Sequence, residues 1–322
     1  MGTTAWRWGP PTFGVIVLAL LPLLLSPYLQ DLLLRVVTLA VFALSLELLV
    51  GTTGLVSLGH AAFYGIGAYA TVMLSPTDAA GSLPGLMAAA LGCAALYALF
   101  VGALSLRTKG VYFIMVTLAF AQMAYFVFHD TKLGGGTDGL YLNVRPVLAV
   151  GGHALVDTDD KRQMLWLAGA LLVGTWALLA LIRRSRFGHA LAGIRVNEQR
   201  MRAAGFPTTL YKLAAFVIAG ALAGLAGFLV AAKDGYVNPE MLSWHESGAV
   251  LLVIILGGLG RLGGAVLGAV TFVLLKELLS TAALVGPLAD HWQLTLGVTI
   301  IAFVALLPKG LIALATARRP RS

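Results

Sequence analysis

The chain has 322 residues, of which 59% are apolar and only 11% charged, so no large soluble domain fits beside its apolar segments. The pI of about 9.8 does not indicate a nucleic-acid partner, because the basic residues flank apolar runs and no basic helix is interleaved with aromatic residues. The single cysteine, Cys93, lies in an apolar run, which excludes an internal disulfide and supports no metal site.

Long apolar runs dominate the chain from its beginning. Seven stretches lack Asp, Glu, Lys and Arg and are long enough to cross about 30 Å of hydrocarbon as helices. Three shorter or interrupted stretches complete the set. In chain order we predict ten membrane helices, at residues 12–29, 32–50, 55–75, 84–106, 111–128, 164–182, 212–232, 246–260, 264–282 and 290–307. The predicted fold class is therefore all-α, a polytopic membrane helical bundle, with residues 1–322 forming one domain.

Charge alternates between the connections of these helices. With the N-terminus in the cytoplasm, the cytoplasmic connections hold one acid, Glu198, among many Lys and Arg residues, whereas the opposite side holds eleven acids and five basic residues. This positive-inside pattern predicts that both termini and the connection 183–212 are cytoplasmic, and that the connection 129–163 lies outside.

Glycines lie mostly inside the apolar segments. Gly220 and Gly224, like the spaced glycines of 260–268, predict close helix packing. The clustered glycines of 51–54 and 257–260 loosen a helix, so there we predict broken or re-entrant segments that line a pathway.

A few polar residues lie inside the predicted spans. Glu47 is far enough into its span that the carboxyl group must be protonated, paired or directed at a polar cavity. His60 near a helix end is satisfied by a backbone carbonyl or acts on a substrate. Thr117 and Gln122 are expected to form hydrogen bonds between helices.

No enzyme motif is found. The sequence contains no Gly-Lys pair and thus no P-loop. Residues 134–139 match G-x-G-x-x-G but lie in an acidic outer loop without a βαβ unit, so they do not indicate a dinucleotide site. We expect neither catalysis nor a bound cofactor or metal.

The cytoplasmic connection 183–212 predicts a short helix over 194–204, with Gly205 as its stop and Pro207 preventing continuation. A solvated loop that serves topology alone would explain its charge but not this helix and its ending. We therefore expect the segment to dock into a groove of a partner.

Several of these segments resemble the permeases of branched-chain amino-acid ABC transporters. The resemblance rests on residues 44–69, 107–122, 134–140, 197–205 and 256–268, covers about 35–310, and is closest to the LivM-like subunit. One departure is Glu47, which stands where the family is expected to carry Asn. The resemblance implies a coupling segment formed by Asn197, Glu198, Arg200, Arg202, Ala203, Ala204 and Gly205. Candidates for the substrate pathway are Glu47, Gly54, Ser57, Gly59, His60, Thr117 and Gln122.

The resemblance also implies a division of labour in a bacterial inner membrane. The chain would pair with a second, LivH-like permease, two cytoplasmic ATPase subunits would bind the ATP, and a periplasmic binding protein would deliver leucine, isoleucine or valine. Related permeases carry urea, amides or other amino acids, so these substrates stay open. An ion-coupled secondary transporter or channel that uses Glu47, Lys276 and Glu277 is the alternative from a different class.

Overall fold

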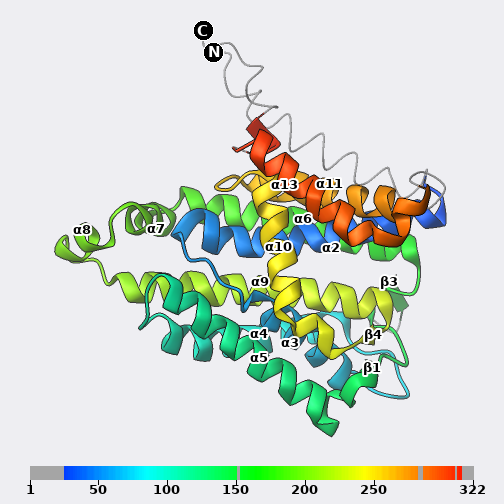
Figure 1. The fold of residues 1–322 in the computed structure, drawn as a ribbon. Coiled ribbons are helices and arrows are strands. Elements are labelled where there is room, and N and C mark those ends of the chain that lie inside the picture. The colour runs from blue at the N-terminus through cyan, green and yellow to red at the C-terminus, as the bar shows by residue number, and fades with distance from the viewer. Residues whose placement is uncertain (1–24, 151–152, 282–285, 309, 314–322) are drawn as a thin grey trace, which may run out of the picture.

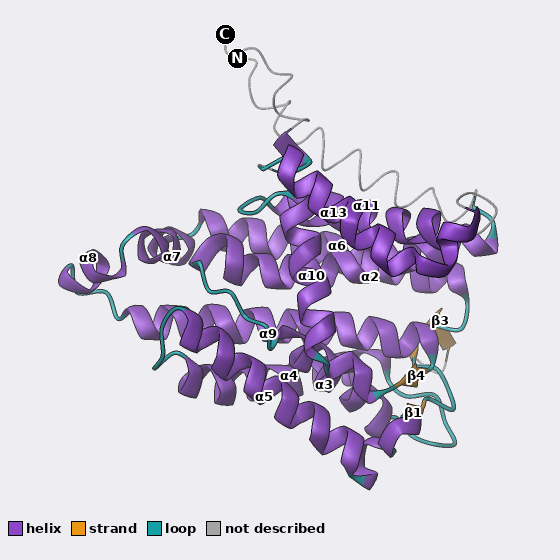
Figure 2. Cartoon of the chain, viewed as in Figure 1, coloured by secondary structure: helices purple, strands orange, loops and turns teal. Residues whose placement is uncertain are grey.

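A computed structural model describes residues 25–150, 153–281, 286–308 and 310–313. Its long helices are α2 (Pro27–Glu47), α4 (Leu83–Ser105), α5 (Val111–Asp130), α6 (Lys161–Arg184), α9 (Thr208–Asp234) and α11 (Leu262–Ser280). Shorter ones are α3 (His60–Met73), α7 (Arg186–Val196), α8 (Glu198–Ala203), α10 (Trp244–Gly257) and α13 (Trp292–Leu306). The all-α prediction is confirmed, and Figure 2 shows how little of the described chain is strand.

Two layers of helices make up the molecule. In Figure 1, α2, α6 and α11 lie in one layer and α3, α4, α5 and α9 in the other, with α10 crossing between them. Helices α2 and α9 are the most buried of the long helices and contact each other, so the core lies where the two layers meet. We call the end of the bundle that carries α7 and α8 the α8 end, and the opposite end, which carries the short strands, the strand end.

Most of the predicted helices have a counterpart. Within the described residues, six helices are long and apolar enough to span a membrane, and α10 and α13 are shorter apolar helices. The first predicted helix, 12–29, lies outside the described residues except for its last residues. These belong to α2, which begins at Pro27, so a boundary between two helices at 30–31 was wrong. Pro27 suits this start because proline is favoured at the first helical position.

Small residues set the spacing between the helices. A Cβ atom added to Gly220 or Gly224 on α9 would lie 2.4 Å from the Cβ of Ala98 or Ala94 on α4. Gly67 on α3 faces the backbone of Gly224 equally closely. The packing role predicted for these α9 glycines is thus confirmed, since a larger side chain would push the helices apart.

Short strands lie in the connection 129–163, where the sequence predicted only a loop. Strand β1 (Leu140–Tyr141) pairs antiparallel with β4 (Tyr236–Val237), and β2 (Val147–Val150) pairs antiparallel with β3 (His153–Asp157). The β1–β4 pair ties this connection to the end of α9. The strand end of the bundle is thereby held together across about a hundred residues of sequence.

Candidate functional site

Helix α2 continues at its end into a helix of a different type. Leu48–Thr53 form a π-helix, η2, which stops at Gly54 in a left-handed conformation with φ +75°. Leu49 O accepts hydrogen bonds from Leu55 N at 3.1 Å and Thr53 Oγ1 at 2.5 Å. The chain then runs without helix until α3 begins at His60, so a helix from residue 55 was wrong, while the break predicted at 51–54 is confirmed. π-helical turns are frequent at functional sites.

Glu47 is the last residue of α2 and is fully buried. Neither carboxylate oxygen forms a hydrogen bond within the described part of the chain. The guanidinium groups of Arg183 and Arg195 lie near enough to stabilise its charge, and the backbone N–H groups of Gly260 and Arg261 also lie nearby. The carboxyl group is therefore buried at the end of its helix, with two arginines near enough to act on it electrostatically.

The two arginines connect α6 and α7 to two other segments at the α8 end. Arg195 of α7 donates a hydrogen bond to Gly51 O in η2, and its side chain packs against Gly54. Arg183 of α6 donates to Gly260 O, at 2.7 Å, in the turn between α10 and α11. Helix α7 thus lies against η2.

Sequence reasoning missed Arg183 and Arg195 as site residues, because they were counted only as basic residues that set the topology. The signal that could have found them is Glu47 itself. A carboxylate near the end of a span needs a cation, and Arg195 lies only two residues before the predicted coupling residue Asn197.

His60 lies at the start of α3 and faces α2. Its Nε2 is 2.8 Å from Ser45 Oγ, and its ring stacks on Phe42 at a centroid distance of 5.6 Å. The partner is thus a hydroxyl group rather than the backbone carbonyl that was one of the two expectations. Ser57 is buried in the loop before α3, and its hydroxyl accepts from Gly59 N at 3.2 Å.

Thr117 and Gly59 also meet at this break. A Cβ added to Gly59 would lie 2.3 Å from Thr117 O, so the loop packs directly on α5. The hydroxyl of Thr117 donates to Ile114 O of its own helix at 2.9 Å, which corrects the expected bond between helices. Gln122 is half-buried, further along α5 from these contacts. The structure therefore brings Gly59, His60 and Thr117 together and leaves Gln122 apart.

The predicted coupling helix 194–204 is in fact two helices, because Asn197 interrupts it. Asn197 has an extended backbone, and its side chain accepts from Arg200 N at 2.9 Å as the N-cap of α8. Gly205 follows α8 with φ +86°, which confirms it as the helix stop. Met201 of α8 packs against Gly193 of α7, so the two helices contact each other directly.

Glu198 anchors α8 to the start of α9. Its Oε1 accepts from Arg202 at 2.7 Å, from Lys212 at 2.9 Å and from the Thr208 hydroxyl at 3.1 Å. Partial burial opposes ionisation, but these partners, Lys212 first among them, hold the pKa of Glu198 below its ordinary value. The carboxylate is therefore charged at neutral pH and fixes the coupling segment at a defined angle to α9.

Helix α8 lies at the tip of the molecule in Figure 1, and apolar side chains around it are exposed. Val196 is 84% exposed and Leu210 63%, and Phe206, Ala203 and Ala204 are also open to solvent. Arg200 and Arg202 border them. A rigid pair of short helices with an apolar tip and a basic border is suited to a groove in a partner protein.

A family model and several curated proteins match the chain. The model described as "Branched-chain amino acid transport system / permease component" matches residues 28–305. The high-affinity branched-chain amino acid transport system permease proteins LivM of Salmonella typhimurium and Escherichia coli are each 31% identical over 297 residues, which is 84% of this chain and 67% of theirs. The ribose import permease protein RbsC of Escherichia coli is 25% identical over 147 residues, which is 44% of each chain.

Proposed function

Because the chain belongs to the family of branched-chain amino acid transport permeases, we propose that it is the LivM-like subunit of an ABC importer for leucine, isoleucine and valine. It is a multi-pass membrane permease and not an enzyme. The observation that carries the choice of substrates is the likeness to LivM over 84% of the chain, whereas the likeness to a ribose permease covers 44%.

The proposed importer needs four kinds of protein. This chain, a single permease domain over residues 1–322, pairs with a second, LivH-like permease. Two ATPase subunits bind beneath the pair and hold the ATP, and a periplasmic binding protein delivers the amino acid. The α8 end faces the cytoplasm and both termini lie on that side, an orientation supported by the concentration of basic residues there.

Coupling to the ATPases runs through α8 and α7. Closure of the ATPases moves the α7–α8 pair as a rigid body. Since Arg195 of α7 is hydrogen-bonded to Gly51 O beside Glu47, this movement reaches η2, the break between α2 and α3. The π-helix is a segment in which a small movement can change the helix path, because its wide turns are less stable than α-helical ones.

The test uses the complex purified through a tag on this chain from its own membrane and reconstituted in proteoliposomes. We expect ATP-dependent uptake of labelled leucine, isoleucine and valine when the binding protein is added, and the co-purified subunits identify the partners. Uptake of urea or an amide in their place would contradict the proposed substrates. Uptake by this chain alone, driven by an ion gradient, would favour a secondary transporter instead.

A further inference from the structure

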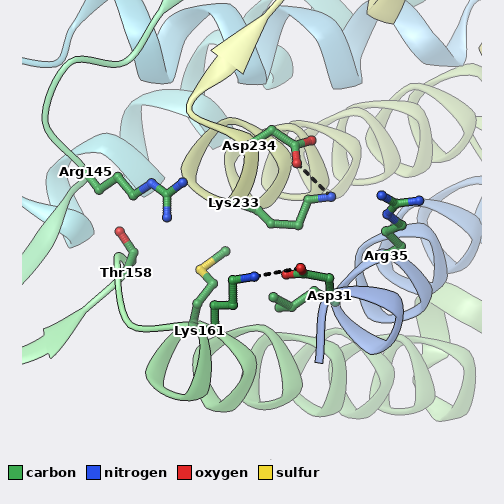
Figure 3. Close-up of a pocket in the computed structure, with 9 residues that line it drawn as sticks. Asp31, Arg35, Arg145, Thr158, Lys161, Lys233 and Asp234 are labelled. Atoms are coloured by element: carbon green, nitrogen blue, oxygen red, sulfur yellow. Dashed lines mark hydrogen bonds and ion pairs between the residues drawn. The ribbon is translucent and has the colours of Figure 1, made fainter. Parts of the chain in front are cut away.

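A cavity of about 400 Å³ opens at the strand end of the bundle, between α2, α3, α9, α10 and α11. It adjoins the charged cavity of Figure 3, with which it shares Arg35, Lys233 and Asp234. The proposed function assigns no role to either cavity. Both lie at the end opposite the coupling segment, which is where a solute from outside would enter.

Most charged groups around the larger cavity already have a partner. Lys233 pairs with Asp234 at 2.9 Å, Tyr125 donates to Glu240 at 3.1 Å, and Tyr28 donates to Glu277. Lys276 lies over the ring of Trp292, 5.3 Å from its centroid.

No contact of this kind is found, in the described part of the chain, for two charged side chains of opposite sign and one buried hydroxyl group. Among the described residues, no hydrogen bond or ion pair joins the side chain of Arg35 or of Glu246 to another side chain, although both residues are exposed and Lys276 lies near enough to Glu246 to act on it electrostatically. In Figure 3 no dashed line reaches Arg35. Thr38 lines the same cavity one helical turn after Arg35, is 4% exposed, and its hydroxyl has no partner among the described residues. A buried hydroxyl without a partner is costly, so a site that supplies one is expected.

Apart from Asn238, the remaining wall of the cavity is apolar. Phe42 and Tyr64 stack at a centroid distance of 4.6 Å, and Phe272 of α11 lines the cavity with them. Phe42 also stacks on His60, which contacts Ser45. The aromatic pair therefore separates the cavity from the polar residues that continue along α2 toward Glu47.

We propose that this cavity is the outer binding site of the permease for a zwitterionic amino acid with an apolar side chain. Arg35 and the Thr38 hydroxyl bind the carboxylate, Glu246 binds the ammonium group, and the side chain lies on Phe42 and Tyr64. A zwitterion offers an opposite charge to Arg35 and to Glu246 at once, whereas a neutral sugar or a singly charged solute offers a counter-charge to at most one of them. The inference rests on the proposed function, since it locates the substrate of that importer.

The test measures protection of an introduced cysteine in the assembled importer. Ala249→Cys places a thiol in the cavity wall in a Cys93→Ala background, and Asp78→Cys is an exposed control outside the cavity. We expect leucine to slow labelling by a thiol reagent at position 249 and not at position 78. 4-Methylpentanoate, which lacks the ammonium group, and 3-methylbutylamine, which lacks the carboxylate, leave labelling unchanged.

Charge-neutralising variants test which side chains bind the charged groups of the amino acid. Arg35→Gln and Glu246→Gln each raise the leucine concentration needed for half-protection about tenfold or more, because a hydrogen bond to a charged group is lost. Lys161→Gln is the matched control, since Lys161 lines only the neighbouring cavity and pairs with Asp31 at 2.7 Å. It leaves protection unchanged.

The outcomes separate this inference from the proposed function. If leucine gives no protection while ATP-dependent leucine uptake by the same preparation is normal, the binding site is wrong and the proposed function stands. If ribose or urea protects position 249 and leucine is not transported, both are wrong. Protection by either singly charged analogue as strong as that by leucine overturns the zwitterion assignment.

Discussion

Glu47 and Gly51 form the tightest contact of the candidate site. They lie one turn apart, and a Cβ added to Gly51 would be 2.0 Å from Glu47 Oε1. Since Glu47 is fully buried, its carboxylate has no exposed space into which it could move. Gly51 is therefore needed because of what stands beside it, and not because of its own backbone conformation.

Gly51→Ala is expected to destabilise the assembled importer by about 1–3 kcal/mol, the usual effect of overfilling a packed interior. Adding Glu47→Ala removes the clash and is expected to restore much of the lost stability. A double-mutant cycle on the apparent Tm in detergent measures this effect. Gly174→Ala is the control, because nothing lies within 4 Å of the added atom. Equal losses in the single and double variants would show that the contact is not responsible.

Glu47→Gln is expected to keep ATP-dependent leucine uptake within a few-fold of the unaltered protein. Arg195 and Arg183 each retain a backbone carbonyl acceptor, at Gly51 and Gly260, so loss of the carboxylate charge leaves neither without a hydrogen bond. The cost is expected to be roughly 1 kcal/mol, near the average for polar contacts in membranes. Complete loss of uptake in an intact complex would instead support a titrating role for Glu47 and the ion-coupled alternative.

At the scale of elements, the two helices of the α7–α8 pair contact different parts of the protein. Glu198 fixes α8 to α9, and Arg195 fixes α7 to η2. The turn after α8 depends on Gly205, because a side chain at φ +86° is strained.

Glu198→Arg combined with Gly205→Val is expected to abolish ATP-driven uptake while insertion and protein amount stay normal. The first change replaces an ion pair with repulsion against Lys212, and the second distorts the turn that presents α8. Gly110→Val is the matched control, since Gly110 also has a positive φ and open surroundings but lies outside the coupling segment. Uptake at the normal rate in the double variant would remove α8 from the mechanism.

The sequence predicted the helices better than their interruptions and contacts. Apolar runs locate α4, α5 and α9 within a few residues, because a span must satisfy its backbone internally. The non-helical stretch before His60 was not predicted. The first turn of α3, which follows it, depends on a distant group, Ser247 Oγ, which accepts from Ala61 N. The contact of Arg195 with Gly51 joins residues 144 positions apart, and no local pattern encodes such a pair.

At the scale of the whole molecule, the acids of the connections are concentrated at one end. Arg183, Arg195 and Arg200 lie at the α8 end, whereas Asp31 and Asp234 lie at the strand end, where the cavity of Figure 3 also holds basic residues, namely Arg35, Arg145, Lys161 and Lys233. This distribution agrees with the charge pattern of the connections, in which one acid lies on the predicted cytoplasmic side. The assignment of the α8 end to the cytoplasm is thus open to a direct measurement.

Cysteines introduced by Asp159→Cys and Arg200→Cys in a Cys93→Ala background test this orientation in intact cells. Both positions are exposed in the isolated chain, so in cells that produce it without the ATPase subunits accessibility to a membrane-impermeant thiol reagent depends on the side of the membrane and not on burial. We expect the first to react in sealed cells and the second only after the membrane is opened, because Lys and Arg in short connections are retained in the cytoplasm. Permeabilised cells, in which both react, supply the control. Equal labelling in sealed cells would overturn the orientation and, with it, the placement of the ATPases beneath α8.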